Sequence, residues 1–527
     1  MMHGLIHDLR MALRQLRRAP GFALTAVLTL AVGIGATTAI FTLVYDVMLR
    51  PLPYPHANRL VVMREIVAEF RDIYPTLPMN ANNFTMWEKN SRSFEAMTAV
   101  EETSMPMGTS DHALEVKVLT ATPGFFSVLG ASPVLGRAFT QAEAQPGHDR
   151  VALLMHSTWR NQFQGASDIV GRTITLNGFP YTVVGVMPES FHLPPLSGLE
   201  GFEAGHLPPV AAIVPRSFST EELNERVGDY NYFGIGLLKS GVSTEQAHDE
   251  INALQREISA GLAGENKATL SSVIQPFQQV LVGTNRRPLL ILLGAVVGLL
   301  LVGCANITNL LLVRANSRRQ QMAVSSALGA RRGEMVRLAL RETVIIAVLG
   351  ALLGVLLAAI LVPMLQQFLP PALNFRGRLR LDWIGLACSA TLAICATLLA
   401  GATPAWLAMR TQPAEVLHSE SRLASESRAS KRVRRVLVVA EVAMSVALVL
   451  MTGLLALSLT RMMHVDRGFE TERTISANVA LPRNAYGKED VRKAFMNALR
   501  RDCTSCPARP TLLSSAGHRS VVTTGST

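Results

Sequence analysis

Five long stretches of the chain are almost free of charged residues. They cover residues 22–45, 288–313, 343–369, 383–409 and 436–460, and Glu441 in the last stretch is their single charged side chain. Each stretch exceeds the roughly 20 residues that a helix needs to cross the hydrocarbon core of a membrane. A core helix of a soluble protein would show polar residues every three or four positions, and these stretches do not. The pattern therefore predicts five transmembrane helices, the first at 22–48, three within 288–410 and the fifth at 436–462.

The basic residues between the predicted spans indicate their orientation. They gather in three segments. Arg10, Arg14, Arg17 and Arg18 precede the first span, and Arg314, Arg318, Arg319, Arg331, Arg332, Arg337 and Arg341 lie between the second and third. Between the fourth and fifth spans lie Arg410, Arg422, Arg428, Lys431, Arg432, Arg434 and Arg435. Segments rich in Arg and Lys stay on the cytoplasmic side. We therefore expect a cytoplasmic N-terminus and an external location for the long segment 49–287. Three arginines between 376 and 380 are a mild exception to this rule.

A short amphipathic helix is predicted before the first span, within residues 1–21. Leu5, Leu9 and Leu16 recur at helical spacing, and Pro20-Gly21 interrupts the pattern before the span begins. A basic amphipathic helix of this kind lies at the inner interface of a membrane. Two interpretations remain open, a topology anchor and an elbow that couples the first span to lateral motion.

The external segment 49–287 shows both helical and strand patterns. Helices are predicted at 80–93, 157–163 and 243–260, and strands at 151–155, 169–178 and 181–186. Asn177-Gly178 is typical of a tight hairpin turn between the last two strands. The expected fold is therefore an α-helical transmembrane bundle of about five spans with a mixed α+β external domain. The segment has no metal-ligand spacing, nucleophile elbow or paired-carboxylate motif, so we expect no enzyme, cofactor or metal.

Composition narrows the class of protein further. Of the 527 residues, 49% are hydrophobic and 17% are charged, which excludes a disordered chain. Five cysteines are too few for a disulfide scaffold. The net charge is +11, but the basic residues gather at membrane edges, so we expect the lipid bilayer and no nucleic acid as partner.

The loop at 314–341, between the second and third spans, suits a docking partner. Small and apolar side chains share one face of a short predicted helix, and Gly329 is placed to end it. A second helix then leads into the third span. The expected docking residues are Gln321, Met322, Ala323, Val324, Ser325, Ala327, Leu328, Gly329, Ala330 and Arg331.

Several motifs in order resemble one family, the ABC permeases of the MacB and FtsX type. Ala323-Val324, followed by Ala327-Leu328-Gly329-Ala330, resembles the coupling-helix signature of this family. Motifs similar to the MacB-type periplasmic core domain are Pro123-Gly124-Phe125-Phe126, Gly136-Arg137-Ala138-Phe139, Val170-Gly171-Arg172, Leu176-Asn177-Gly178 and the stretch 183–188. The stretches 17–22 and 49–54 resemble the duplicated "orphan" permeases of this family. The resemblance implies a MacB-like periplasmic core domain at 49–287 and an FtsX-like membrane domain at 288–410.

The resemblance also implies partners and a mechanism. A separate cytoplasmic ABC ATPase would dock on the coupling helix and move the spans and the periplasmic domain, a process called mechanotransmission. It further implies a bacterial inner-membrane location, a homodimer or pseudo-dimer, and a periplasmic partner. The sequence has no Gly-x-x-x-x-Gly-Lys-Ser/Thr phosphate loop, so ATP hydrolysis is expected on another chain. The family usually has Glu where Gln321 stands and Arg where Ser325 stands, and the loss of both charges either weakens docking or is tolerated.

The rest of the chain reads as the start of a second half. We predict a cytoplasmic linker at 411–435, the start of a second periplasmic domain at 463–501, and a disordered tail at 502–527. The duplicated family members continue beyond this point, so we expect a C-terminally truncated member. Cys503 and Cys506 are interpreted as an accidental pair.

Two functional questions stay open at this stage. Glu441 is either an interfacial partner of Arg434 and Arg435 or a proton or substrate site. The expected function is a permease subunit of an ABC-type export or mechanotransmission system. The alternatives are an FtsX-like regulatory protein that controls an external partner, and a non-functional truncated fragment.

Overall fold

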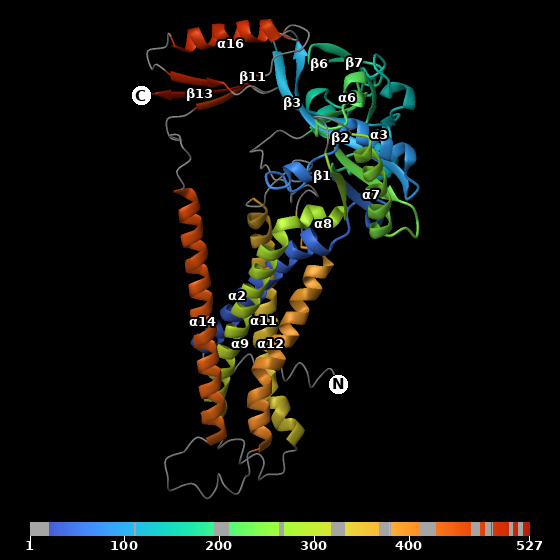
Figure 1. Cartoon of the computed structure of the whole chain (residues 1–527). Helices are drawn as coiled ribbons and strands as arrows, with labels where there is room; N and C mark the ends of the chain where they lie inside the picture. Colours follow the sequence, from blue (N-terminus) through green and yellow to red (C-terminus); the bar gives the residue numbers. More distant parts are fainter. Residues whose placement is uncertain are drawn as a thin grey trace, which may run out of the picture. The chain divides into compact units, whose positions relative to one another are not determined.

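The protein is described by a computed structural model in which the chain forms two compact units (Figure 1). The described residues are 20–109, 112–193, 210–262, 268–317, 332–367, 379, 381–410, 428–464, 475–479, 486, 489–504, 510–514 and 520–526. The membrane unit comprises Met1–Arg50, Thr284–Pro370 and Gly377–Val465. The soluble unit comprises Pro51–Gly283, Pro371–Arg376 and Asp466–Thr527.

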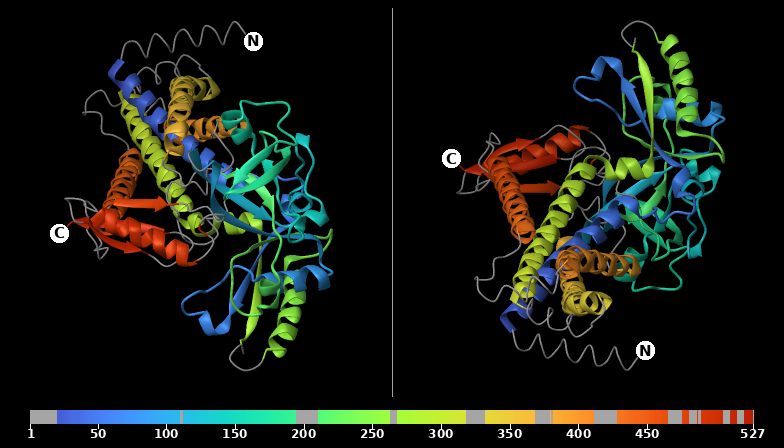
Figure 2. Two further views of the ribbon diagram at one scale, coloured as in Figure 1. Left: turned by 90° about the horizontal axis from the view of Figure 1, so that it is seen from above. Right: turned by 90° about the horizontal axis from the view of Figure 1, so that it is seen from below.

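The membrane unit consists of long apolar helices. They are α2 (Pro20–Val44), continued by the π-helical turn η1 (Tyr45–Leu49), α9 (Arg286–Ser317), α11 (Arg332–Gln366), α12 (Trp383–Arg410) and α14 (Arg428–Met463). Among the described residues, five helices are long and apolar enough to cross a membrane, and they coincide with the five predicted spans. Helix α2 packs against α9, α11 and α12, while α14 packs against α9. Figure 2 shows α2 running alongside α9.

The soluble unit is built on a ten-stranded mixed sheet. Its strands are β1 (Leu60–Val67), β2 (Phe94–Thr109), β3 (His112–Ala121), β4 (Leu135–Gly136), β5 (Val151–Leu154), β6 (Thr173–Leu176), β7 (Phe179–Val186), β8 (Val210–Pro215), β9 (Phe233–Leu238) and β10 (Leu270–Pro276). The order is β10-β1-β9-β2-β3-β8-β5-β7-β4, and β6 pairs with β2 and β7. The pairs β3–β8 and β5–β7 are parallel, and the others are antiparallel.

Short helices connect and cover these strands. They are α3 (Ala81–Asn90), α4 (Phe125–Leu129), α5 (His156–Gln162), α6 (Thr220–Asn224), α7 (Thr244–Ala260) and α8 (Phe277–Val282), with the 3₁₀ turns η2 (Ala57–Arg59), η3 (Ala68–Phe70), η4 (Gln141–Ala144) and η7 (Gly283–Asn285). Helix α7 begins where Ser243 and Gln246 form a capping box. The β6–β7 turn holds Asn177 and Gly178 at φ of 52° and 79°, as a hairpin turn of the predicted type requires. The mixed α+β prediction is thereby confirmed.

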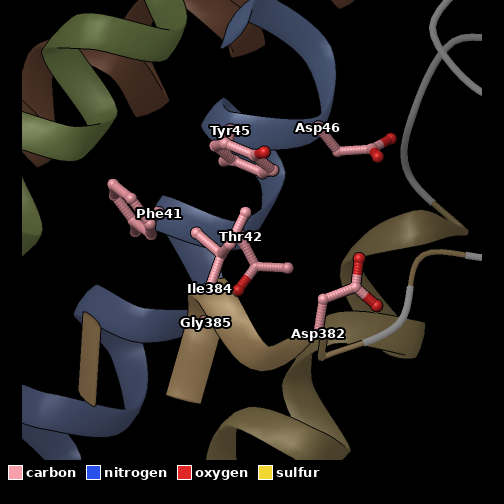
Figure 3. Close-up of a pocket in the computed structure, with 7 residues that line it drawn as sticks. All are labelled: Phe41, Thr42, Tyr45, Asp46, Asp382, Ile384 and Gly385. Atoms are coloured by element: carbon pink, nitrogen blue, oxygen red, sulfur yellow. The ribbon is translucent and has the colours of Figure 1, made fainter. Parts of the chain in front are cut away.

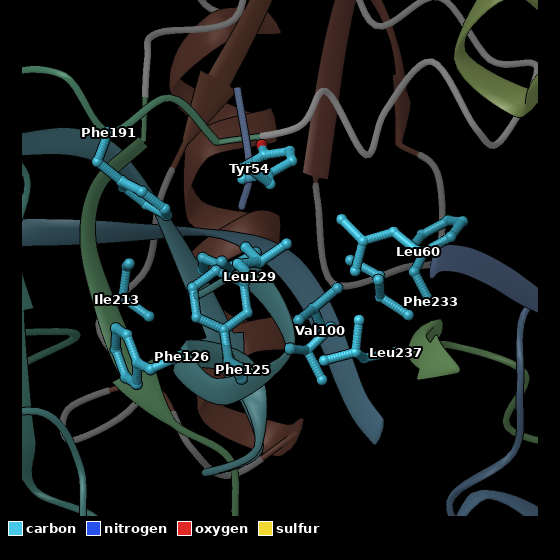
Figure 4. Packing of buried hydrophobic residues seen from close by; sticks show 14 of the residues in the cluster. Tyr54, Leu60, Val100, Phe125, Phe126, Leu129, Phe191, Ile213, Phe233 and Leu237 are labelled. Atoms are coloured by element: carbon cyan, nitrogen blue, oxygen red, sulfur yellow. The ribbon is translucent and has the colours of Figure 1, made fainter. Parts of the chain in front are cut away.

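Three clusters of buried apolar side chains lie among the described residues of the soluble unit, and two of them pack against its helices α4, α3 and α7. One surrounds α4, whose Phe125 and Phe126 meet edge to face with ring centroids 5.3 Å apart (Figure 4). The other lies beneath α3 and α7 and contains the fully buried Phe84 and Trp87. Burial of such large side chains supplies most of the favourable free energy of folding in this unit.

A separate three-stranded sheet follows the last membrane helix. Strand β11 (Ile475–Val479) and helix α16 (Glu489–Thr504) precede β12 (Pro510–Ser514) and β13 (Ser520–Ser526). Here the structure differs from the disordered tail expected at 502–527, because β13 pairs with both β11 and β12. The β-branched run from Val521 to Thr524 favours a strand. A search for apolar periodicity overlooks such a run, since half of it is threonine.

Candidate functional site in the membrane unit

Helix α2 is the centre of the membrane unit. Of its span, 72% is buried inside the structure, against 0% of the α14 span. Its Ala26, Leu30 and Ile34 pack in one cluster with Ile307 of α9 and Ile346 of α11. A displacement of α9 or α11 therefore displaces the surface against which α2 is packed.

Glycines bring the backbones of α2 and α11 into contact. A Cβ atom added at Gly35 would lie 2.9 Å from the carbonyl oxygen of Gly354. A Cβ added at Gly354 would lie 3.2 Å from the carbonyl oxygen of Ala31, and one added at Gly350 would lie 2.7 Å from Cβ of Leu30. Gly350 and Gly354 form a Gly-x-x-x-Gly pair, the usual means of close helix approach in membranes. The Gly-x-x-x-Gly spacing is readable in the sequence, although it was not among the features predicted from it.

Buried hydroxyl groups add directional ties between α2 and its neighbours. The Thr38 and Ser389 hydroxyls lie 2.9 Å apart and join α2 to α12. The Thr37 hydroxyl donates to the Gly33 carbonyl at 2.7 Å and to the Val296 carbonyl of α9 at 3.2 Å. Hydrogen bonds of this kind between membrane helices contribute about 0.6 kcal/mol on average. They therefore fix the register of α2 more than they add to stability.

A polar cluster closes the C-terminal end of α2. The Arg50 guanidinium, just beyond the π-helical turn, lies 2.8 Å from the Asp46 carboxylate and 3.7 Å from the Asp382 carboxylate. The hydrogen bond to Asp46 raises the pKa of Arg50 above its ordinary value, against the opposing effect of burial. Arg50 thus links the end of α2 to the residue that precedes α12. π-Helical turns occur frequently at functional sites.

Figure 3 shows a small pocket beside this cluster. Its lining residues are Phe41, Thr42, Tyr45, Asp46, Asp382, Ile384 and Gly385. The two carboxylates lie on the same side of it (Figure 3). A Cβ added at Gly385 would lie 3.0 Å from the Thr42 hydroxyl, so the two helices approach closely here. The pocket therefore lies at the packing contact between the end of α2 and the start of α12.

Glu441 contacts α9 in the structure. Its Oε2 accepts a hydrogen bond of 3.3 Å from Nδ2 of Asn309. The same two helices approach near Gly298, where an added Cβ would lie 3.9 Å from Leu448. The two interpretations of Glu441 from the sequence, a partner of Arg434 and Arg435 or a proton or substrate site, did not include Asn309, because this pairing joins positions 132 residues apart.

The predicted docking residues, from Gln321 to Arg331, lie outside the described residues. Helix α9 ends at Ser317 and α11 begins at Arg332, on either side of this loop. The predicted amphipathic segment before Pro20 and most of the linker at 411–435 also lie outside the described part of the chain. These assignments therefore remain predictions from the sequence.

Within the described residues, the contacts of the membrane unit are helix-packing contacts and a few polar pairs. No group of three or more His, Cys, Asp or Glu side chains in that part of the chain could hold a metal ion. Cys304, Cys388 and Cys395 are free thiols within the spans. The contacts described above are helix crossings at glycines, hydrogen bonds of buried hydroxyl groups, and the ion pairs of Arg50.

The fold and site define a class, a multi-pass membrane protein with a mixed α+β soluble domain. Residues 23–254 match the MacB-like periplasmic core domain, and residues 293–413 match the FtsX-like permease C-terminal domain. The chain therefore belongs to the ABC permeases of the MacB/FtsX type. The five apolar helices and these family matches make the chain a multi-pass inner-membrane protein with a periplasmic domain.

Individual relatives are distant. The macrolide export ATP-binding/permease protein MacB of Salmonella typhi is 26% identical over 304 residues, which cover 56% of this chain and 42% of that protein. The uncharacterized ABC transporter permease YknZ of Bacillus subtilis is 22% identical over 267 residues, which cover 50% of this chain and 61% of that protein. The chain thus matches about half the length of these curated relatives.

Solved structures of related domains resemble part of the chain. The periplasmic region of MacB from Actinobacillus actinomycetemcomitans aligns with a TM-score of 0.29 and 13% identity, covering 41% of this chain and 89% of that one. The extracellular domain of YknZ from Gram-positive bacteria aligns with the same TM-score and identity, covering 41% of this chain and 99% of that one.

Proposed function

We propose that the chain is the permease subunit of an ABC-type export or mechanotransmission system. A separate cytoplasmic ATPase docks on residues 321–331 and hydrolyses ATP. The N-terminus lies in the cytoplasm, and two permease copies or a pseudo-dimer face the two ATPase subunits. The resulting motion of the spans is delivered to the periplasmic domain and to a partner there.

The supporting observation is that two membrane helices that pack together, α2 and α9, are joined along the chain to two sheet strands that pair together, β1 and β10. Helix α2 leads through residues 50–59 into β1, and β10 leads through α8 and η7 into α9. Strands β1 and β10 pair antiparallel over seven residue pairs, from Val61↔Pro276 to Val67↔Leu270. Helices α2 and α9 pack against each other in the membrane unit.

This connectivity favours transmission of force. A hydrogen-bonded strand pair resists sliding, because a shift of one residue would turn every side chain to the opposite face. Val61 and Met63 of β1 pack in one apolar core and Val62 in another, so such a shift would move each side chain into a core packed for other residues. A relative motion of α2 and α9 is therefore expected to move β1 and β10 as a pair rather than to separate them.

Docking is tested by co-purification with the cognate ATPase from detergent-solubilised membranes. Leu328→Asp places a charge on the apolar face of the predicted coupling helix, and we expect it to abolish co-purification. Gln320→Asp is the matched control, since it adds the same charge just outside the predicted docking residues, and it should retain the ATPase. If Leu328→Asp retains the ATPase as well as the control does, the docking assignment is wrong.

A further inference from the structure

Glu65 is a charged residue in the middle of an otherwise apolar part of the soluble unit. It lies on β1, and its residue is 0% exposed. Its backbone is fully engaged, since its N–H donates to Leu77 at 2.9 Å and its carbonyl accepts from Leu77 at 2.8 Å. The carboxylate is therefore held in place by the strand and cannot reach water without an opening of the fold.

Amides from two helices surround this carboxylate. Oε1 accepts from the backbone N–H of Asn80 at 3.0 Å, and Oε2 accepts from Nδ2 of Asn83 at 2.7 Å and from Nε2 of Gln255 at 3.3 Å. Asn80 caps α3, Asn83 lies in its first turn, and Gln255 belongs to α7. One carboxylate thus joins β1 to both helices that cover the second core, through neutral donors.

Three buried oxygens beside this cluster lack donors. Among the described residues, Oδ1 of Asn83, Oε1 of Gln255 and the hydroxyl of Tyr230 are buried without a hydrogen-bond partner. A buried polar atom left unpaired costs about 1–3 kcal/mol. A protonated Glu65 supplies an additional O–H donor, and the amide groups can rotate to present their oxygens to it. An amide oxygen that lacks a donor beside the carboxylate form can thus accept from the neutral acid.

Burial is the dominant influence on the protonation of Glu65. Burial raises the pKa of Glu65 to about 7, against the three hydrogen bonds, which favour the charged form. Burial and the charge of Glu65 raise the pKa of Tyr230, on which Glu69 and Glu225 also act. The side chains that contact the Glu65 carboxylate from α3 and α7 are amides. The charged groups that act on the neighbouring Tyr230 are all carboxylates.

We propose that Glu65 is a proton-binding site that makes the packing of α3 and α7 on the sheet respond to the pH outside the membrane. The proton is taken from solvent onto the carboxylate, and no other group changes charge. When α3 and α7 open and expose the carboxylate, Glu65 recovers the ordinary affinity of a glutamate. This property goes beyond the proposed permease function and does not depend on an ATPase.

The sign of the effect follows from this difference in proton affinity. Between pH values of about 4.5 and 7, the closed state holds the proton and the open state does not. Closed packing is therefore fully stabilised below pH 4.5 and loses this contribution as the pH rises. Above pH 7 the opening equilibrium becomes independent of pH again, with the carboxylate charged in both states.

Hydrogen–deuterium exchange of the full chain in lipid nanodiscs tests the proposal. After correction for intrinsic exchange rates, we expect opening of residues 81–90 and 244–260 to increase about sixfold per pH unit from pH 5 to 7, or roughly 40-fold in all. Glu65→Gln, which imitates the protonated side chain, should show no such slope. Glu221→Gln, on the exposed first turn of α6, is the matched control and should behave like the natural protein.

Equal slopes in the natural protein and in Glu65→Gln would overturn the proposal. Infrared difference spectroscopy gives a second readout that does not require the variant to fold. The carbonyl band of a protonated carboxylic acid should disappear with a midpoint near pH 7 in the natural protein. A band that disappears only near pH 4.5, with no acid titrating above it, would equally overturn the assignment.

Discussion

Replacement of Gly35 by alanine tests the close crossing of α2 and α11. The new methyl carbon would lie 2.9 Å from the Gly354 carbonyl oxygen, 3.0 Å from Cδ2 of Leu357 and 3.1 Å from its Cβ. The Leu357 side chain can rotate away in part, but the Gly354 carbonyl is helix backbone. The two helices must therefore separate by several tenths of an ångström along a contact that also includes Gly350.

Two opposing contributions determine how much Gly35→Ala changes the free energy of unfolding. Overpacking of a filled interior costs about 1–3 kcal/mol. Replacing glycine by alanine inside a helix returns about 1 kcal/mol. We therefore expect Gly35→Ala to lower the free energy of unfolding by about 1 kcal/mol, and Gly35→Ile to disrupt the crossing, because its extra carbons have no space beside Gly354.

Gly294 of α9 offers the matched control, since a Cβ added there would meet nothing within 4 Å. Gly294→Ala should gain up to about 1 kcal/mol from helix propensity alone. The measurement is reversible unfolding of the full chain in mixed micelles with increasing sodium dodecyl sulfate. The two alanine variants should shift the midpoint in opposite directions, and a Gly35→Ala midpoint at or above that of Gly294→Ala would refute the proposed backbone contact.

Three further predictions concern other parts of the fold. Trp87→Ala should lower the free energy of unfolding of the soluble unit by about 3–5 kcal/mol, because Trp87 is 0% exposed. Trp87→Phe should lower it much less, and thermal unfolding followed by circular dichroism distinguishes the two variants. Asn309→Val should weaken the α9–α14 contact by about 0.6–1.7 kcal/mol, because it removes the hydrogen bond to Glu441. The measurement is disulfide trapping between cysteines placed at Gly298 and Leu448, which should be reduced. Undiminished trapping would show that the Glu441 contact is dispensable. Arg137 lowers the pKa of Glu143 to about 2, so this carboxylate stabilises the soluble unit above pH 4.5 and loses that contribution as the pH falls toward 2. Glu143→Gln should remove this part of the acid dependence of stability. An unchanged acid unfolding transition in the variant would contradict the pairing.

The features predicted from sequence depend on residues that are close together in the chain. The five spans follow from uninterrupted apolar runs, α7 from its amphipathic pattern, and the β6–β7 hairpin from Asn177-Gly178. Each of these signals acts within one element or one turn. A single sequence therefore contains enough information to place them.

The remaining features depend on contacts between distant positions. Glu65 and Gln255 are 190 positions apart, and the parallel β3–β8 pair joins strands separated by several other elements. Glu65 stands beside Arg64 in a strand, where alternation predicts one of the two on each face. The sequence cannot show that the carboxylate faces two helices rather than solvent. The same reason hides the link between Arg50 and Asp382.

The central claim is that ATP hydrolysis on a partner moves α2 and α9 and thereby the paired strands β1 and β10. It is tested most directly by hydrogen–deuterium exchange at Leu60–Val67 and Leu270–Pro276 in nanodiscs that contain the chain and its cognate ATPase. Exchange is compared between ADP and a non-hydrolysable ATP analogue. We predict a nucleotide-dependent change in both strands that is lost in Leu328→Asp. Identical exchange in both nucleotide states, with a bound and active ATPase, would contradict the account.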